Sequence, residues 1–294
     1  MSRRVVLVVL VLIVASVGFE ATDVGAQFRL PGIPGIPGLS RSEPEQNPMD
    51  MFRAFEDMDE PQEVEVGRSA AATVGARYKI LRDVALTKYV AMVGNTVAAA
   101  SDRPDLRYYF AVLDTPELDA LATPGGFVFV SRGALDVMRD EAMLAGVLGH
   151  EIGHVALKHH NATLKAQRGK ALAMFGANIG LGFVPGPAGY FTPVMSLVLD
   201  TAAEGVLKGH SREEEMESDR VGFQYAARAG YDPAGLREFL AELAAKKSDA
   251  GVTKFFATHP GIDDRLQEQT KMQQARTASG GKREAERFVK AMGR

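Results

Sequence analysis

HEIGHVALKHH, residues 150–160, holds four of the six histidines of this 294-residue chain. Asp140 is a candidate N-cap for a helix that runs from Glu141 to about His160. In such a helix His150 and His154 lie one turn and about 40° apart, so both imidazoles leave the same face at a separation that one metal ion can bridge. The stretch therefore predicts a helix that carries two metal ligands.

The glutamate between these histidines has a second predicted role. Glu151 lies about 100° round the helix from His150, close enough to hydrogen-bond a water on the metal without binding the metal itself. This is the arrangement that the H-E-x-x-H pattern of metal-dependent hydrolysis requires. A polar helix face is the other interpretation of the same residues.

His160 raises an alternative, because metzincin proteases use a third histidine six positions beyond the second ligand. Those proteins need a glycine three residues after the second histidine, and here that position is Leu157, a good helix former. If the helix continues, His160 lies about 9 Å along the axis beyond His154. We therefore interpret His159 and His160 as cations that complement the helix dipole, and expect the third ligand elsewhere.

A second acidic stretch, HSREEEMESDRVG at residues 210–222, is the best source of that ligand. Ser211 and Glu214 form a capping box for a helix that closes at Ala229-Gly230. Glu215 and Asp219 share one face of it, so one carboxylate can bind a metal while the other hydrogen-bonds a ligand imidazole. A solvated acidic face is the alternative interpretation.

Small residues support a close approach of the two helices. Gly222 extends the Glu215/Asp219 face by one turn. The first helix has a small-residue stripe of its own, at Ala142, Ala145, Gly146, Gly149, Gly153 and Ala156. A shared metal requires such an approach, although a tightly packed core would also explain it.

The composition excludes several classes of protein. The chain has 46% hydrophobic residues, enough for a sizeable core, and its net charge of -3 provides no basic surface for nucleic acid. Cysteine is absent, which excludes disulfides, thiolate ligands and cysteine nucleophiles. Any metal must be held by histidines and carboxylates.

The pattern of the N-terminal region predicts an export signal followed by a linker. Residues 1–26 resemble a signal peptide, with basic Arg3 and Arg4, the apolar run 5–19 and a small-residue cleavage site at residues 24–26. Because that run is shorter than the ~20 residues that span a bilayer, we expect cleavage near Gln27 and a periplasmic protein, with an uncleaved inner-membrane anchor as the alternative. Peripheral association with the outer or inner membrane, and the oligomeric state, are left open.

The remaining chain divides by composition into a Pro/Gly-rich linker at 27–50, one domain at 51–268 and a C-terminal helical tail at 269–294. Apolar periodicity predicts amphipathic helices between residues 63 and 100, and strands at 107–114 and 126–131. The apolar segment 171–207 is broken by prolines and has no run long enough to span a membrane. We interpret it as a buried helical layer, with a mobile lid as the alternative.

Together these motifs resemble a zinc metallopeptidase family that includes the CAAX prenyl proteases, the HtpX heat-shock proteases and the periplasmic BepA-like proteases. The resemblance covers roughly residues 63–268 and is carried by YVAMVG (89–94), LDALATPGGFVFVSRGAL (118–135), HEIGH (150–154), Glu215 with Asp219, and HPGIDDR (259–265). The family pattern has an asparagine at the position of Asp119 and an alanine at that of Ser218. The resemblance implies an α+β, mostly α-helical, zincin-like domain with a small β-sheet beside the active-site helix.

The resemblance also assigns roles. It implies one Zn²⁺ per chain held by His150, His154 and Glu215, with Glu151 as general base and Asp219 as the carboxylate behind a ligand histidine. His259 and Arg265 are the candidate donors to the oxyanion of the reaction. His259 is also a candidate fourth ligand that would hold the enzyme inactive.

We therefore expect a zinc-dependent metalloendopeptidase that hydrolyses unfolded or misassembled proteins of the cell envelope, as part of periplasmic protein quality control. The strand at 127–130 is expected to offer a free edge that pairs with an extended substrate, through Gly126, Phe127, Val128 and Phe129. No acidic anchor for a free amino terminus is recognisable, which favours an endopeptidase. The alternative is a latent or chaperone-like zinc-binding protein without turnover, against which the intact Glu151 argues.

Overall fold

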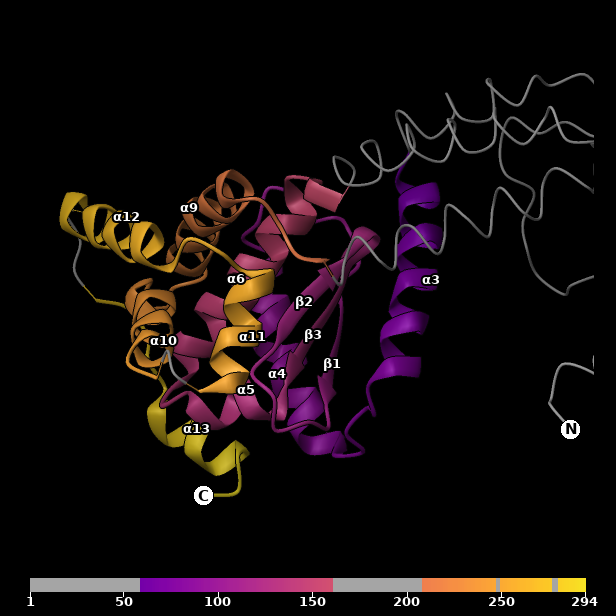
Figure 1. Cartoon of the computed structure of the whole chain (residues 1–294), viewed down its shortest axis with the longest axis horizontal. Coiled ribbons are helices and arrows are strands. Elements are labelled where there is room, and N and C mark those ends of the chain that lie inside the picture. Colours follow the sequence, from indigo (N-terminus) through magenta and orange to yellow (C-terminus); the bar gives the residue numbers. More distant parts are fainter. Residues whose placement is uncertain (1–58, 161–207, 247–248, 277–279) are drawn as a thin grey trace, which may run out of the picture. The chain divides into compact units, whose positions relative to one another are not determined.

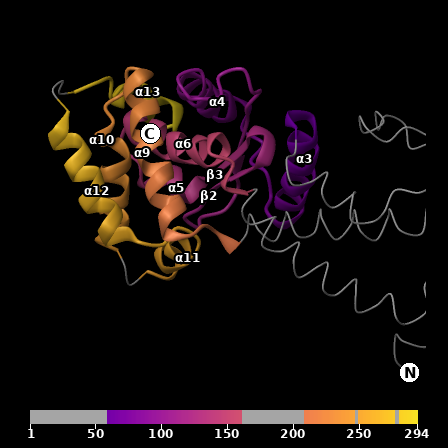
Figure 2. The ribbon, with the colours of Figure 1, turned by 90° about the horizontal axis from the view of Figure 1, so that it is seen from above.

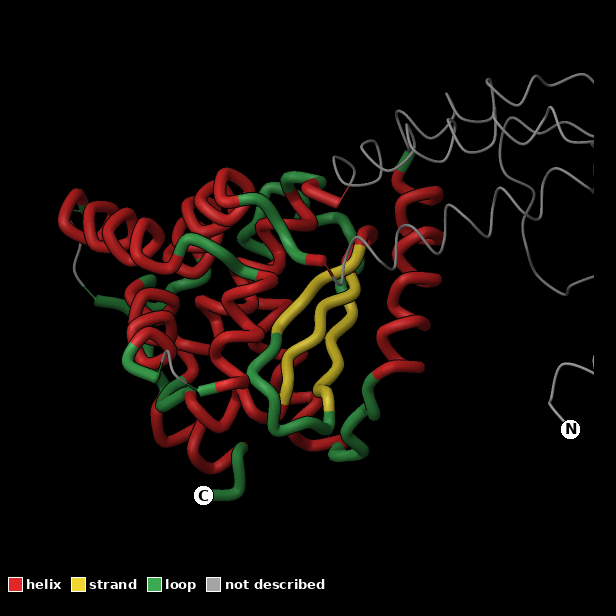
Figure 3. The backbone as a smooth tube through the Cα atoms, viewed as in Figure 1, coloured by secondary structure: helices red, strands yellow, loops and turns green. Residues whose placement is uncertain are grey.

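A computed structural model of the chain describes residues 59–160, 208–246, 249–276 and 280–294 (Figure 1). The expected signal peptide, the linker and the apolar segment 171–207 lie outside these residues. The described chain is mostly helical with one small sheet (Figure 3). Its elements are α3 (Glu60–Arg77), α4 (Val84–Ala98), β1 (Tyr109–Leu113), β2 (Ala120–Thr123), the 3-10 turn η2 (Pro124–Gly126), β3 (Phe127–Ser131), α5 (Arg132–Val137), α6 (Glu141–Ala156), α9 (Arg212–Arg228), α10 (Ala234–Ala244), α11 (Ala250–Thr258), α12 (Ile262–Ala275) and α13 (Ala285–Ala291).

The sheet has the strand order β1-β3-β2. β1 pairs parallel to β3, with Tyr109 opposite Phe127, and β2 pairs antiparallel to β3, with Ala120 opposite Val130. The strands expected at 107–114 and 126–131 are thus confirmed as β1 and β3. The composition did not reveal β2, because its four residues are all buried and show no alternation.

The topology corrects one expectation about this sheet. β3 is the central strand, so both of its edges are paired, and residues 126–129 cannot offer a free edge to a substrate. Its apolar and aromatic pattern is the same for a central and an edge strand, so the sequence could not distinguish them. In the described part of the chain, β2 is the edge strand that faces the site described below.

Helices cover both faces of the sheet. α3 packs on one face, whereas α4 and α6 pack on the other (Figures 1 and 2). A Cβ atom at Gly67 of α3 would lie 1.7 Å from the carbonyl oxygen of Pro124, so α3 rests directly on the turn that joins β2 to β3. The amphipathic helices expected before residue 100 are confirmed, and the buried face of α4 carries Leu86, Val90, Val93 and Val97.

α6 is the central helix of the described fold and is buried from Glu141 to Val155. Asp140 caps it as expected, because its carboxylate accepts a hydrogen bond from the Met143 N–H at 3.0 Å. The helix ends earlier than expected, at Ala156, because Lys158 adopts a left-handed conformation with φ of 56°. The helix-forming tendency of Leu157 is therefore overridden by the contacts of the residues that follow.

α9 and α10 pack against α6 at the predicted small residues. A Cβ atom at Gly222 of α9 would lie 2.8 Å from the backbone of Gly149 and His150, which confirms the expected close approach of α6 and α9. The N-terminal half of the small-residue stripe of α6 packs against α10 instead, because a Cβ atom at Gly146 would meet the backbone of Leu236. The capping box of Ser211 and Glu214 is also confirmed, with hydrogen bonds of 3.2 and 2.8 Å.

The C-terminal helices belong to the same fold. The boundary expected at residue 268 falls inside α12, and α13 packs against α4 and α6. Phe288 of α13 is 1% exposed and joins the main hydrophobic core. No helix among the described residues is long and apolar enough to span a membrane.

Candidate metal centre and active site

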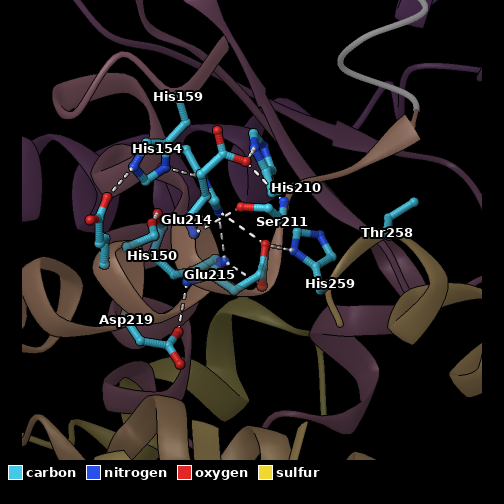
Figure 4. Close-up of polar contacts among 12 residues, drawn as sticks. His150, His154, His159, His210, Ser211, Glu214, Glu215, Asp219, Thr258 and His259 are labelled. Carbon is cyan, nitrogen blue, oxygen red and sulfur yellow. Dashed lines mark hydrogen bonds and ion pairs between the residues drawn. The ribbon is translucent and has the colours of Figure 1, made fainter. Parts of the chain in front are cut away.

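Four side chains from three helices converge at one point. His150 and His154 leave α6, Glu215 leaves the first turn of α9, and His259 follows the last residue of α11 (Figure 4). One potential ligand atom from each lies within 4.8 Å of the others, and all four side chains are buried. The structure therefore brings together the three predicted ligands and His259, and we call these four residues the donor cluster.

The donor atoms have the spacing of a metal site. The Nε2 atoms of His150 and His154 are 3.1 Å apart. The Glu215 carboxylate lies 3.5 Å from Nε2 of His150 and 3.3 Å from Nε2 of His154. Ligands about 2.1 Å from a tetrahedral ion lie about 3.4 Å from one another. Two imidazoles and a carboxylate with one further position suit a zinc-type ion, so the residues present fit a metal.

The protonation of the ligands also fits. Burial lowers the pKa of both His150 and His154, which keeps the imidazoles neutral. Asp219 accepts a hydrogen bond from Nδ1 of His150 at 2.8 Å, so the Nε2 lone pair of that ring points at the cluster. This is the contact expected for Asp219.

Arg265 lies behind the ligands and does not face the pocket. Its guanidinium donates to both carboxylate oxygens of Asp219, at 2.8 and 2.7 Å, and to Glu215 at 2.5 Å, while the residue is 1% exposed. Burial alone would raise the pKa of Glu215, but Arg265 and the neighbouring histidines together outweigh it and hold the pKa well below its usual range. The expected role as an oxyanion donor is therefore corrected, since the contacts of Arg265 are those of a residue that positions the carboxylates.

Two further polar residues bind the backbone behind the ligands. Ser218, where the family pattern has an alanine, donates its hydroxyl to the carbonyl oxygen of His150 at 2.5 Å. Gln269 of α12 donates to the carbonyl oxygen of Asp219 at 3.3 Å. The sequence carried no signal for Gln269, because it is one of several glutamines in a largely polar helix.

The turn after α6 overturns the expectation for His159 and His160. Because the helix ends at Ala156, both residues fold back and are buried, at 6% and 5% exposed. Burial lowers the pKa of each, so they are neutral side chains and not cations at a helix end. His160 is not part of the donor cluster, so the third ligand does lie elsewhere. The reason is the turn after α6, and not the continued helix that we expected.

His154 has two histidine neighbours that the sequence did not reveal. Its Nδ1 lies 2.8 Å from Nδ1 of His159, and the ring of His210 stacks on it with centroids 3.7 Å apart (Figure 4). Nε2 of His159 in turn lies 3.2 Å from the carboxylate of Glu217. The same three histidines have potential ligand atoms within 4.8 Å of one another.

Glu151 lies between the donor cluster and a pocket. The pocket is lined by the β2 edge at residues 118–122 and by Tyr78, Glu151, His210, Lys254, Phe255 and His259. Glu151 is 2% exposed, and burial raises its pKa to about 8. A carboxylate that is both buried and next to a donor cluster is a typical catalytic group.

His259 joins the cluster to the edge strand. Its Nδ1 lies 3.2 Å from Oε1 of Glu215, and its Nε2 donates to the carbonyl oxygen of Ala120 at 3.0 Å. Burial alone would lower the pKa of His259, but the Glu215 carboxylate outweighs it and raises the pKa to about 9. His259 thus occupies a main-chain acceptor of β2 in this structure.

Asp119, which stands where the family pattern has an asparagine, also lines the pocket. Its Oδ2 accepts a hydrogen bond from the Tyr78 hydroxyl at 3.3 Å. Burial raises the pKa of its carboxyl group.

Comparison with known proteins agrees with this geometry. The beta-barrel assembly-enhancing protease of Yersinia pestis is 28% identical over 209 residues, which cover 70% of this chain and 42% of that protein. Metalloprotease YcaL of Escherichia coli is 33% identical over 160 residues, 54% of this chain and 59% of YcaL. The mitochondrial metalloendopeptidase OMA1 of Schizosaccharomyces pombe is 29% identical over 181 residues, 61% of this chain and 51% of OMA1.

This chain spans less than half the length of the assembly-enhancing proteases that it matches. The family model described as Peptidase family M48 matches residues 85–273. That region extends from α4 to α12 and contains the buried cluster of His150, His154 and Glu215, which is consistent with an HExxH zinc site. Because the match covers more than half of the chain, this protein belongs to peptidase family M48.

Proposed function

We propose that this chain is a zinc-dependent endopeptidase that binds one zinc ion through His150, His154 and Glu215. The observation that carries the proposal is the convergence of these three donors beside a buried glutamate that lines a pocket. A binding protein has no need of a buried carboxylate in that place.

The chain's own residues supply the remaining steps. A bound zinc ion acidifies a water molecule and polarises the substrate carbonyl. Glu151 takes the proton of the attacking water and hands it to the leaving amine. Nε2 of His259 donates to the carbonyl oxygen of Ala120, and once a substrate takes over that acceptor His259 is the donor available to the developing oxyanion.

The substrate is an extended polypeptide that pairs with β2. Ala120 lies on the edge of that strand beside Glu151 and His259, so its carbonyl oxygen is an acceptor for a substrate N–H once His259 releases it. Main-chain pairing favours unfolded protein over any one sequence. Residues 118–122 thus take the place that the sequence interpretation gave to residues 126–129.

The cellular role that best suits these features is protein quality control in the cell envelope. The N-terminal sequence resembles a signal peptide, and similar proteins include proteases named for enhancing beta-barrel assembly. We place the protein in the periplasm after cleavage near Gln27. Mass spectrometry of the protein from cell envelopes tests this, since an intact N-terminus would indicate an anchored enzyme instead.

A latent zinc-binding protein is the second candidate, and the contacts of His259 favour it. This side chain joins a predicted ligand to the substrate edge, where it blocks the main-chain acceptor of Ala120. In this state the chain would bind zinc without turnover. Substitution of His259 by alanine would then increase cleavage of an unfolded substrate, whereas a loss of cleavage would assign His259 to the catalytic step.

The deciding experiment compares the purified chain with its Glu151→Gln variant on casein in the presence of zinc. Cleavage by the wild type that a chelator abolishes, with no cleavage by the variant and equal zinc content in both, is the expected result. If neither protein cleaves although each binds one zinc ion, the chain is latent. If the wild type binds no zinc, the proposal of a zinc site is wrong.

A further inference from the structure

Among the described residues, no carboxylate contacts Nδ1 of His154 in the way that Asp219 contacts Nδ1 of His150. Instead Nδ1 of His154 faces another imidazole, that of His159, at 2.8 Å. On the far side of His159, Nε2 lies 3.2 Å from the carboxylate of Glu217. A chain of three side chains therefore leads from the donor cluster to the surface, where the Glu217 side chain is 58% exposed.

The protons along this chain can be assigned once Nε2 of His154 is taken as a ligand of the proposed zinc ion. Nε2 of His154 faces His150 and Glu215, so it must offer its lone pair to the metal and carry no proton. Nδ1 of His154 then carries the proton and donates it to Nδ1 of His159. Nε2 of His159 carries the remaining proton and donates to Glu217, so every ring nitrogen has one role.

The backbone is built to bring His159 back to His154. Five residues separate the two, which would place them on different sides of a continuous helix. The left-handed conformation of Lys158, with φ of 56°, ends the helix and turns the chain, and such a conformation is unfavourable for a residue other than glycine. The strain is retained where it places a buried histidine against a ligand.

We propose that His159 is a positioning residue that holds His154 in the tautomer and orientation for metal binding, with Glu217 as the acceptor at the end of the chain. This inference rests on the proposed zinc site. In this arrangement His150 is held by Asp219 directly, whereas His154 is held by His159, which in turn contacts Glu217. Outer partners of this kind contribute roughly 10- to 100-fold to metal affinity.

The same histidines could instead form a second metal site, since ligand atoms of His154, His159 and His210 lie within 4.8 Å of one another. That reading requires Nδ1 of His154 to lose its proton while Nε2 binds the first metal. A neutral imidazole cannot offer both lone pairs, so the hydrogen-bonded arrangement is favoured.

The test measures zinc affinity by competition with a chelator, and the rate of zinc release, for His159→Ala in the full chain. The expected result is a loss of affinity of roughly 10- to 100-fold and faster release. His159→Asn should restore part of the affinity, because its amide oxygen can accept the His154 proton. Glu217→Gln should give a smaller loss of affinity in the same direction.

His160→Ala is the matched control. His160 lies on the same turn and is equally buried, but its Nε2 has no hydrogen-bond partner among the described residues, so zinc affinity should not change. Unfolding of the metal-free proteins, measured in parallel, separates a folding defect from a loss of positioning. Asparagine rescue of affinity is not expected from a purely structural role.

Two results would overturn the inference. Equal zinc affinity in His159→Ala and the wild type would show that His159 does not act on the ligand. Two zinc ions per wild-type chain, with one lost in both His159→Ala and His210→Ala, would assign these residues to a second metal site. If the wild type binds no zinc at all, it is the proposed function that fails.

Discussion

The residue that most clearly organises the donor cluster is Arg265. One buried guanidinium binds two buried carboxylates, one a predicted ligand and the other the partner of His150. Without it, two negative charges in a low-dielectric interior would lose the guanidinium that both contact, which is strongly unfavourable.

We expect Arg265→Ala to lower the free energy of unfolding of the metal-free protein by roughly 3–5 kcal/mol. Chemical denaturation checks this, and added zinc should recover part of the loss because the cation compensates the same carboxylates. Arg220→Ala is the control: its ion pair with Glu268 is half exposed, and its removal should change stability by less than about 1 kcal/mol. Equal effects of the two substitutions would contradict this account.

Glu141, at the opposite end of α6 from the histidines, is a second buried charge with a full set of partners. Its carboxylate accepts hydrogen bonds of 2.7 Å from the hydroxyls of Tyr89 and Tyr231 and is paired with Arg287. Burial alone would raise the pKa of Glu141, but these partners outweigh it and lower the pKa below its usual 4.5.

A lowered pKa in the folded state means that the ionised form stabilises the fold. This stabilisation is complete above the unfolded-state pKa of 4.5 and is lost as the pH falls through the lower folded-state value. We expect Glu141→Gln to lower the free energy of unfolding by roughly 3 kcal/mol at pH 7, with a difference from the wild type that shrinks below about pH 4.5. Urea denaturation over a pH series checks this, with the exposed Glu286→Gln as control, and a pH-independent difference would contradict it.

At the scale of elements, the contact between α6 and α9 sets the spacing of the ligands. His150 and His154 come from one helix and Glu215 from the other, so the distance between the helix axes decides whether the three donors fit one ion. Gly149 and Gly222 permit that distance because neither has a side chain at the crossing.

We expect Gly222→Ala to force the helices apart. Its Cβ atom would lie 2.8 Å from the backbone of Gly149 and His150, which cannot yield as a flexible side chain would. The free energy of unfolding should fall by roughly 1–3 kcal/mol, and zinc affinity should fall with it. Gly75→Ala in α3 is the control, because nothing lies within 4 Å of its Cβ position and alanine favours a helix. Unchanged zinc affinity in Gly222→Ala would argue against helix spacing as the determinant.

At the scale of the whole molecule, the C-terminal residues are part of the folded unit. α13 packs Phe288 into the same core as α4 and α6, and Arg287 closes the cluster around Glu141. A tail that merely followed the domain would have neither contact.

We expect Phe288→Ala to lower the free energy of unfolding by roughly 3–5 kcal/mol, as for a large side chain removed from a core. Val289→Ala, at a position 39% exposed on the same helix, should change stability by less than about 1 kcal/mol. Guanidinium denaturation of both variants distinguishes an integral helix from a tail. A small effect of Phe288→Ala would restore the boundary near residue 268.

Local sequence patterns were sufficient for several features of the molecule. The capped start of α6 at Asp140, the capping box of α9, the strands β1 and β3, and the pairing of two histidines one turn apart all follow from side chains that are near one another in the chain. Such features depend on helical and strand periodicity, which is a local property. The small-residue stripes added a correct statement about a distant contact, because close helix approach leaves few choices of residue.

Only the tertiary structure decided how distant residues share the site. Nothing in the sequence near β3 shows that both of its edges are paired, and nothing in the sequence near Arg265 shows that its partners are the carboxylates of α9. The end of α6 is the clearest case: Leu157 favours a continued helix, yet the helix ends at Ala156 and the turn at Lys158 buries His159 against His154. A local propensity of a few tenths of a kcal/mol is outweighed by contacts that exist only once the chain has folded, so the predicted ligands and Asp219 could be found by pattern, whereas the contacts of Arg265 and His159 could not.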